Sequence, residues 1–117
     1  MSGATPPRLP DYLQHMAEAM VRIQRYVQGL SEDAFANDEK TQDAVLRNIE
    51  VLGEAARNIM QQHPQFAAAH PKVPWALLYG MRNRISHGYF SVDRGLVWVT
   101  IQRDMPALLT QVNALRA

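Results

Sequence analysis

The most informative part of the chain reads Met81-Arg82-Asn83-Arg84-Ile85-Ser86-His87-Gly88-Tyr89-Phe90. We expect it to close a helix that starts near Pro74, because the missing N–H of proline costs nothing in a first helical turn. Gly88 is predicted to end this helix in the left-handed conformation, which places His87 in the last turn. There the helix dipole favours the imidazolium by roughly 0.3–1 kcal/mol.

The two faces of this helix differ in character. Leu77, Met81 and Ile85 recur every four residues and predict a stripe that is buried. On the opposite face, spacings of three and four bring together Gly80, Asn83, Arg84 and His87. The helix contains no acid and no lysine. This concentration of guanidinium and imidazole suits a phosphate-containing ligand, although arginine and histidine in a last turn can also simply complement the helix dipole.

Further amphipathic segments predict long helices elsewhere. One runs from Asp11, a candidate N-cap, to about Gly29, with apolar residues at spacings of three and four. His15 lies off this apolar stripe and is expected to be a plain surface residue. A second segment runs from about Asp38 to Gln62 and is apolar over most of its circumference, which is typical of a central helix.

The last segment begins at Asp93, a candidate N-cap, and continues to the end of the chain. Pro106 should bend this helix without ending it, because the apolar stripe resumes in phase. Residues 31–35 predict a short capped turn anchored by Phe35, and residues 63–71 predict a connector. Together the segments predict an all-α fold, an antiparallel four-helix up-and-down bundle with short extra helical turns.

Polar residues in the helix predicted over residues 38–62 allow two interpretations. Gly53 in its interior costs about 1 kcal/mol relative to alanine. In one interpretation Arg47 forms surface pairs with Glu50 or Glu54, worth a few tenths of a kcal/mol. In the other, Gly53 lets another helix approach closely, while Asn48 and Glu54 form a buried polar layer behind the arginine and histidine of the segment quoted above.

The composition limits the kind of protein. A chain of 117 residues with 47% hydrophobic residues fits one domain, which we place at residues 11–117 after a flexible arm at residues 1–10. The absence of cysteine excludes disulfides and thiolate metal sites. No apolar run approaches the roughly 20 residues that span a bilayer, so we expect a cytoplasmic protein, without a metal or cofactor. A net charge of +1 is too small to indicate nucleic-acid binding by itself. If the protein binds RNA, the positive charge must be local or must come from two chains brought together.

The order of the motifs resembles a known family. Arginine, four residues and then histidine at a helix end are similar to the signature of the HEPN superfamily, and the run from Arg82 to Asp93 resembles its HepT-like branch. Residues 41–50 with the run Gly53-Glu54-Ala55-Ala56 resemble the second helix of that branch. Val73-Pro74-Trp75 resembles the entry to its third helix. The resemblance covers the chain from about Tyr12 to the last helix.

The resemblance implies a function and a partner. HepT-like proteins are metal-independent endoribonuclease toxins of type VII-like toxin–antitoxin pairs, and their helical domains form two-fold homodimers. Their partner is a small nucleotidyltransferase antitoxin called MntA, which attaches AMP to the tyrosine of a His-x-Tyr string. His87-Gly88-Tyr89 matches that string, so Tyr89 is the expected modification site. The Tyr89 hydroxyl follows Gly88 at a helix end and is expected to reach solvent. An AMP joined to it is expected to satisfy Arg82 and Arg84 and to occupy the space that the RNA backbone needs.

The implied reaction is attack of the RNA 2′-hydroxyl on the adjacent phosphorus. His87 is the expected proton-transfer residue and Arg82 the expected ligand of the phosphoryl oxygens. The residues expected to support the site or bind RNA are Asn83, Arg84, Arg47, Asn48 and Glu54. Arg82 and His87 lie about 140° apart around an ideal helix. They converge on one phosphate only if His87 swings out at the helix end or a homodimer completes the cleft.

Two other functions are compatible with the same residues. One is a non-catalytic module that binds RNA or a nucleotide, and the other is a helical interaction partner of a nucleotidyltransferase. Cleavage of RNA by the purified protein, lost when His87 is changed, separates the enzyme from both.

Overall fold

The computed structural model describes residues 8–116, and every regular element in that range is helical. The elements are α1 (Leu9–Val27), α2 (Glu32–Ala36), α3 (Glu39–Gln62), α4 (Pro64–Ala69), α5 (Trp75–His87), the 3-10 turn η1 (Tyr89–Ser91), α6 (Arg94–Arg103) and α7 (Met105–Arg116). The all-α class is therefore confirmed.

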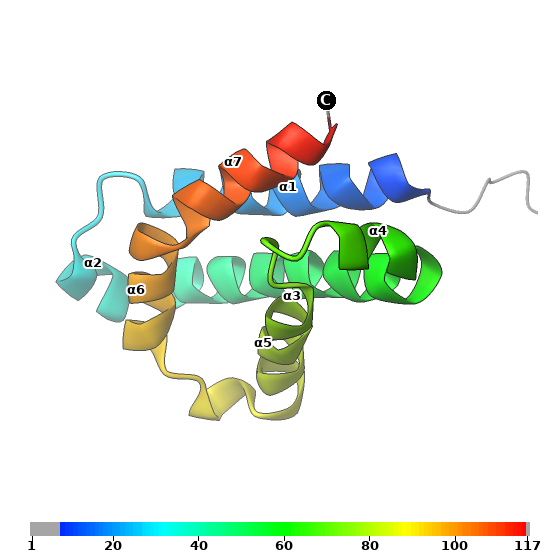
Figure 1. Cartoon of the computed structure of the whole chain (residues 1–117). Helices are drawn as coiled ribbons and strands as arrows, with labels where there is room; N and C mark the ends of the chain where they lie inside the picture. The colour runs from blue at the N-terminus through cyan, green and yellow to red at the C-terminus, as the bar shows by residue number, and fades with distance from the viewer. Residues whose placement is uncertain (1–7, 117) are drawn as a thin grey trace, which may run out of the picture.

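The helices pack around one apolar core. Figure 1 shows α1 and α3 side by side and running in opposite directions, with α7 against α1. α5 and α6 run across the direction of α3. The side chains shielded most completely include Phe35, Met16, Met20, Ile23, Leu46 and Ile49. Because α5 and α6 cross the α1–α3 pair, the arrangement does not confirm a simple up-and-down bundle of four helices.

Side-chain caps start several helices where the sequence predicts their beginnings. Ser31 caps α2, Asp38 caps α3 and Asp93 caps α6, each accepting a hydrogen bond at 3.0–3.1 Å from the N–H three residues further on. Phe35 is buried under α2, as expected. The connector after α3 contains one more short helix, α4.

α1 begins earlier than predicted. Its N-cap is Arg8, whose backbone N–H donates to the carboxylate of Asp11 at 2.9 Å, so Asp11 acts from within the first turn. Leu9 and Pro10 therefore belong to the helix and not to the expected arm, because proline is well tolerated in a first turn. The rest of that arm, residues 1–7, lies outside the described residues.

The glycines that follow α1 and α5 behave differently. Gly29 has a φ of +80° and adopts the left-handed conformation that glycine allows. Gly88 has a φ of −152°, so the predicted left-handed end of α5 is wrong. Its N–H still donates to the carbonyl of Arg84, and its carbonyl accepts from the N–H of Ser91, both at 2.9 Å. The chain therefore passes directly from α5 into η1 without a left-handed reversal.

α5 buries the predicted apolar stripe only in part: Ile85 is buried as expected, but Leu77 is not. The buried residues of this helix are Trp75, Leu78 and Ile85. Leu77, expected in the buried stripe, is 58% exposed, and Met81 is only partly buried. The cause is Gly53 of α3, where a Cβ would lie 2.5 Å from both the Leu78 carbonyl oxygen and the Cβ of Arg82. The missing side chain lets α5 approach closely and turn residues 78 and 82 towards α3.

The last predicted helix is two helices. α6 ends at Arg103 and α7 begins at Met105, so the expectation that Pro106 only bends one helix is wrong. Pro106 has no N–H to donate back to α6, but it fits the first turn of a new helix. The apolar stripe across the break is buried as predicted at Val97, Ile101, Met105, Leu108 and Val112. None of the helices within residues 8–116 has the length and apolarity needed to cross a membrane.

We predict that Gly53→Ala destabilises the protein, although alanine is the better helix former. Overpacking against the backbone of α5 should cost about 1–3 kcal/mol, more than the roughly 1 kcal/mol that alanine gains in a helix. Gly80→Ala is the matched control, because no atom lies within 4 Å of a Cβ there. Urea unfolding of both variants measures the difference, and a Gly53→Ala protein as stable as Gly80→Ala would contradict the close approach.

Candidate active site

Arg82 faces the body of the protein. Its guanidinium lies 3.3 Å from the Glu54 carboxylate of α3 and donates to the side chain of Asn83 at 3.1 Å. Arg57 approaches the other oxygen of Glu54 at 3.6 Å. The Arg82 side chain is 30% exposed, so part of its guanidinium remains accessible to an anion. The ion pair with Glu54 therefore orients Arg82 without enclosing it.

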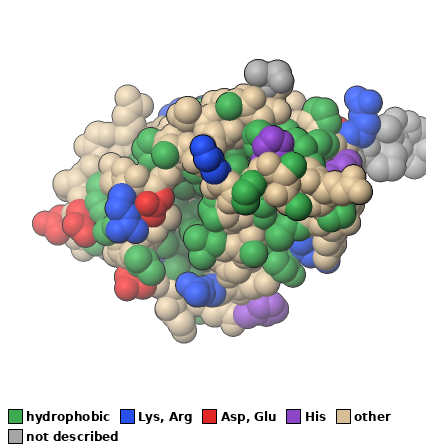
Figure 2. All heavy atoms as spheres, in the orientation of Figure 1, with side chains coloured by type: hydrophobic (Ala, Val, Ile, Leu, Met, Phe, Trp, Pro, Cys, Tyr) green, Lys and Arg blue, Asp and Glu red, His purple; other side chains and the backbone are tan. Residues whose placement is uncertain are grey.

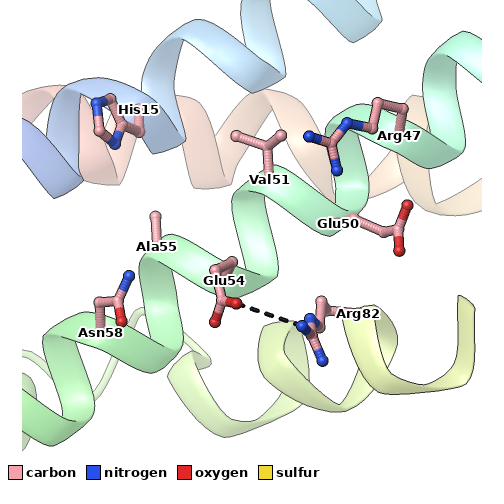
Figure 3. Close-up of a pocket in the computed structure, with 8 residues that line it drawn as sticks. All are labelled: His15, Arg47, Glu50, Val51, Glu54, Ala55, Asn58 and Arg82. Atoms are coloured by element: carbon pink, nitrogen blue, oxygen red, sulfur yellow. Dashed lines mark hydrogen bonds and ion pairs between the residues drawn. The ribbon is translucent and has the colours of Figure 1, made fainter. Parts of the chain in front are cut away.

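A hollow of about 310 Å³ opens beside this ion pair, between α1, α3 and α5 (Figure 3). It is lined by His15, Arg47, Glu50, Val51, Glu54, Ala55, Asn58 and Arg82. Arg47 therefore shares a surface with Arg82, as expected of a supporting residue. His15, expected to be a plain surface residue, also lines it and is exposed. No local pattern could have placed His15 there, because only the packing of α1 against α3 does so.

His87 lies on a different surface. It is exposed in the last turn of α5 and lines a groove of about 680 Å³ between α5 and α6, together with Arg84. The apolar side chains of this groove include Leu77, Met81, Leu96 and Val97. Figure 2 shows the hydrophobic hollow on this face, with basic and histidine side chains near its edge. Arg82 and His87 therefore line separate surfaces of one chain, in agreement with their angular separation around the helix.

The expected polar layer behind the motif is present only in part. Glu54 contacts Arg82, but Asn48 is 92% buried, with its side chain donating at 2.9 Å to the carbonyl of Ala44 in its own helix. Among the described residues, Asn48 makes no hydrogen bond to Arg82 or His87. The Asn48 side chain therefore finds its hydrogen-bond partner within α3. Of the two residues, only Glu54 contacts Arg82.

Asn83 belongs to a polar cluster around Tyr79. It accepts a hydrogen bond from Arg82, and the Asn83 side chain, followed by the Arg57 guanidinium, lowers the pKa of Tyr79. Arg57 also lies 5.8 Å from the centre of the Tyr79 ring. Asn83 thus links the arginine of the motif to an exposed polar surface of α5.

Tyr89 is tied to two other helices. Its hydroxyl donates a hydrogen bond to the carboxylate of Asp43 in α3, and this bond lies at an exposed position. The Arg94 guanidinium lies 5.3 Å from the ring centre and donates to the carbonyls of Tyr89 and Val92 at 2.9 and 2.7 Å. Partial burial, together with the Asp43 hydrogen bond, raises the pKa of Tyr89 to about 12. The phenol is therefore protonated at neutral pH.

The roles of Asp43 and Arg94 could not be read from the sequence. Asp43 precedes Tyr89 by 46 positions, and nothing in the local spacing connects them. A second hydrogen bond to α3 joins Ser86 to Glu50: the serine hydroxyl donates to the Glu50 carboxylate at 2.9 Å. These bonds hold the segment around His87 against α3.

The chemistry available is that of guanidinium and imidazole. Within residues 8–116 no group of three histidine, aspartate or glutamate side chains is placed to hold a metal ion. His87 can exchange a proton with a bound substrate, and Arg84 in the same groove can contact an anionic oxygen. Both surfaces also carry carboxylates, Glu50 and Glu54 in the hollow and Asp93 and Asp104 in the groove.

Comparison with known proteins identifies relatives across most of the chain. Residues 16–115 match the family model described as Ribonuclease HepT-like. A protein of Thermococcus cleftensis named "Probable ribonuclease HepT" is 38% identical over 106 residues, covering 91% of this chain and 94% of the relative. A candidate RNase of Caldanaerobacter subterraneus is 34% identical over 102 residues, covering 87% of this chain and 88% of the relative. No solved structure shows a significant match.

Proposed function

The chain belongs to the ribonuclease HepT-like family, and on that premise we propose that it is a metal-independent endoribonuclease, the cytoplasmic toxin of a type VII-like toxin–antitoxin pair. The observation that carries this proposal is the exposed His87 beside Arg84 in an open groove at the end of α5. A group that transfers protons to a large polymer must be accessible, and the groove leaves it so.

In the proposed reaction, the RNA 2′-hydroxyl attacks the adjacent phosphorus and the 5′-oxygen leaves. His87 transfers the protons, and guanidinium groups stabilise the charge that develops on the phosphoryl oxygens. Because Arg82 and His87 line different surfaces, we propose that the RNA strand crosses the end of α5 and contacts both. Arg84 lines the same groove as His87, and Arg47 lines the hollow beside Arg82 as a second guanidinium for the strand.

We predict that His87→Ala reduces RNA cleavage by roughly 10²–10⁴-fold, because proton transfer is lost. The wild-type protein should cut in the presence of a chelator, leave 2′,3′-cyclic phosphate and 5′-hydroxyl ends, and leave a 2′-deoxy substrate intact. Mass spectrometry of the RNA fragments identifies the ends. Products with a 5′-phosphate would exclude this mechanism, and RNA binding without cleavage by the wild-type protein would favour the non-catalytic module.

The variant Glu54→Gln, measured in the same assay, separates two roles of Arg82: the ion pair with Glu54 and the proposed contact with the phosphoryl oxygens. This variant weakens the ion pair but keeps the guanidinium, whereas Arg82→Lys removes the planar fork that binds phosphoryl oxygens. We expect Arg82→Lys to lower the cleavage rate by more than Glu54→Gln. Equal losses in the two variants would assign Arg82 a purely structural role.

We further propose that the functional unit is a two-fold homodimer that pairs through the groove between α5 and α6. One chain supplies one histidine to this groove, and two proton transfers are needed. The groove exposes apolar side chains, with Leu77 58% and Leu96 55% exposed. A second copy packed on the apolar part of this face would cover Leu77 and Leu96, leave the His87 end of the groove open to RNA, and bring two His87 side chains to one cleft.

We predict a mass near twice 13.2 kDa by light scattering at micromolar concentration. Leu77→Glu should give a monomer with much reduced cleavage, because it places a charge in the apolar contact. Val21→Glu is the matched control, since Val21 is 47% exposed on α1 and lies outside the groove. A wild-type monomer that cuts RNA would refute the homodimer.

We also propose that the toxin is silenced by an MntA-like nucleotidyltransferase that joins AMP to Tyr89. The phenolic oxygen bonds to the α-phosphorus of ATP, pyrophosphate leaves, and the phenolic proton is lost. The hydrogen bond to Asp43 is then lost, and the new phosphate lies near the carboxylates of Asp43 and Glu50, which repel it. The modification therefore displaces the segment next to His87, in addition to obstructing the RNA.

We predict that incubation with the cognate nucleotidyltransferase and ATP adds AMP to the wild-type protein and to Tyr79→Phe, but not to Tyr89→Phe. Intact-mass spectrometry and the cleavage assay measure the two effects together. Modification of Tyr89→Phe, or inhibition without added mass, would show that Tyr89 is not the switch. The rate of modification should increase with pH, because the pKa of Tyr89 is raised to about 12 and the phenol must lose its proton.

A further inference from the structure

Phe90 is the most exposed large apolar side chain among the described residues. It is 95% exposed, whereas the next, Leu77, is 58% exposed. A phenylalanine in that position buries almost no apolar surface and so contributes little to folding. The side chain is therefore available to a molecule that binds outside the fold.

The backbone that carries Phe90 is held firmly although the ring is free. Phe90 is the central residue of η1. On its N-terminal side, the Tyr89 hydroxyl donates to Asp43, and the Arg94 guanidinium donates to the carbonyls of Tyr89 and Val92, which flank Phe90. Its ring stands edge-on to the Tyr89 ring, with the ring centres 5.5 Å apart and the planes at 79°. These hydrogen bonds restrain the backbone from which the ring projects, so less backbone entropy is lost when a ligand stacks on the ring.

The surroundings of Phe90 are polar. Ser86, His87 and Ser91 nearby in the chain are all exposed, and His87 lies only three residues before it. An anchor for a protein partner usually stands at the centre of a desolvated patch. An isolated aromatic ring beside a proton-transfer residue is instead typical of a site that stacks nucleobases.

The chemistry of RNA cleavage requires such a surface. The 2′-oxygen must align with the phosphorus and the departing 5′-oxygen, and the regular stacked helix does not present this geometry. The nucleotides that flank the scissile phosphate must therefore unstack, which exposes a base face to water. Phe90 lies on the segment that lines the His87 groove at Gly88 and Ser91. An aromatic ring on this segment can replace the lost stacking partner, and base–aromatic stacking is worth about 1–3 kcal/mol.

We propose that Phe90 is the stacking platform for a base next to the scissile phosphate, so that the protein selects unpaired RNA. This inference depends on the proposed ribonuclease function. Phe90 makes no hydrogen bond through its side chain, so the platform accepts any base and discriminates between single-stranded and paired RNA, not between base sequences.

The test measures binding of a short single-stranded RNA that contains 2-aminopurine, whose fluorescence is quenched by stacking. His87→Ala is the background, so that the RNA stays intact. The comparison is with His87→Ala/Phe90→Leu, which keeps an apolar side chain but removes the aromatic face, and with His87→Ala/Phe90→Trp, which restores one. We expect a roughly 5- to 150-fold loss of affinity and loss of the fluorescence change with leucine, and recovery of both with tryptophan.

Cleavage by the single variants complements the binding assay. Phe90→Leu should raise the KM for single-stranded RNA by a larger factor than the KM for a perfect duplex, whose bases are already stacked. Equal affinity and fluorescence for leucine and phenylalanine, while wild-type protein still cuts through His87, would overturn the platform and leave the ribonuclease proposal intact. A change in the light-scattering mass of Phe90→Leu with unchanged RNA affinity would assign Phe90 to a protein contact and also overturn the proposal.

Discussion

The close approach of α5 to α3 at Gly53 is the contact on which the rest of the site depends. Because no Cβ separates the two backbones, Leu78 and Arg82 turn towards α3 and the guanidinium reaches Glu54. The same rotation leaves Leu77 outside, at the edge of the groove between α5 and α6. The missing side chain of Gly53 thus decides both which residues of α5 are buried and which are exposed at the groove.

This rotation separates the functional groups of the motif. Arg82 lies at the hollow between α1, α3 and α5, whereas His87 and Arg84 line the groove on the other side of α5. A small metabolite in one pocket could not contact both surfaces, but a polymer that crosses the helix end can. The RNA strand that we propose for this protein is long enough to do so, and the chain's family is one of ribonucleases.

The segment after His87 connects the proposed activities. Tyr89 is bonded to Asp43, Arg94 holds the carbonyls on either side of the turn, and Phe90 projects from its centre. A covalent change at the Tyr89 hydroxyl removes the proton that Asp43 accepts, and so it loosens the backbone that positions both His87 and Phe90. The proposed catalysis, substrate stacking and inhibition would therefore all depend on this one short segment.

The sequence by itself determined the helical class, most helix boundaries and the motif, because periodicity, caps and glycine or proline positions act over a few residues. A close approach at Gly53 was one of the two interpretations that the sequence left open. Only the tertiary structure decided which face of α5 is buried, that Pro106 starts a new helix, and that Asp43 meets Tyr89 across 46 positions. Such contacts depend on how the helices rotate and pack against one another. The packing free energy that sets these rotations is a sum over the whole core, so no local sequence pattern reports it.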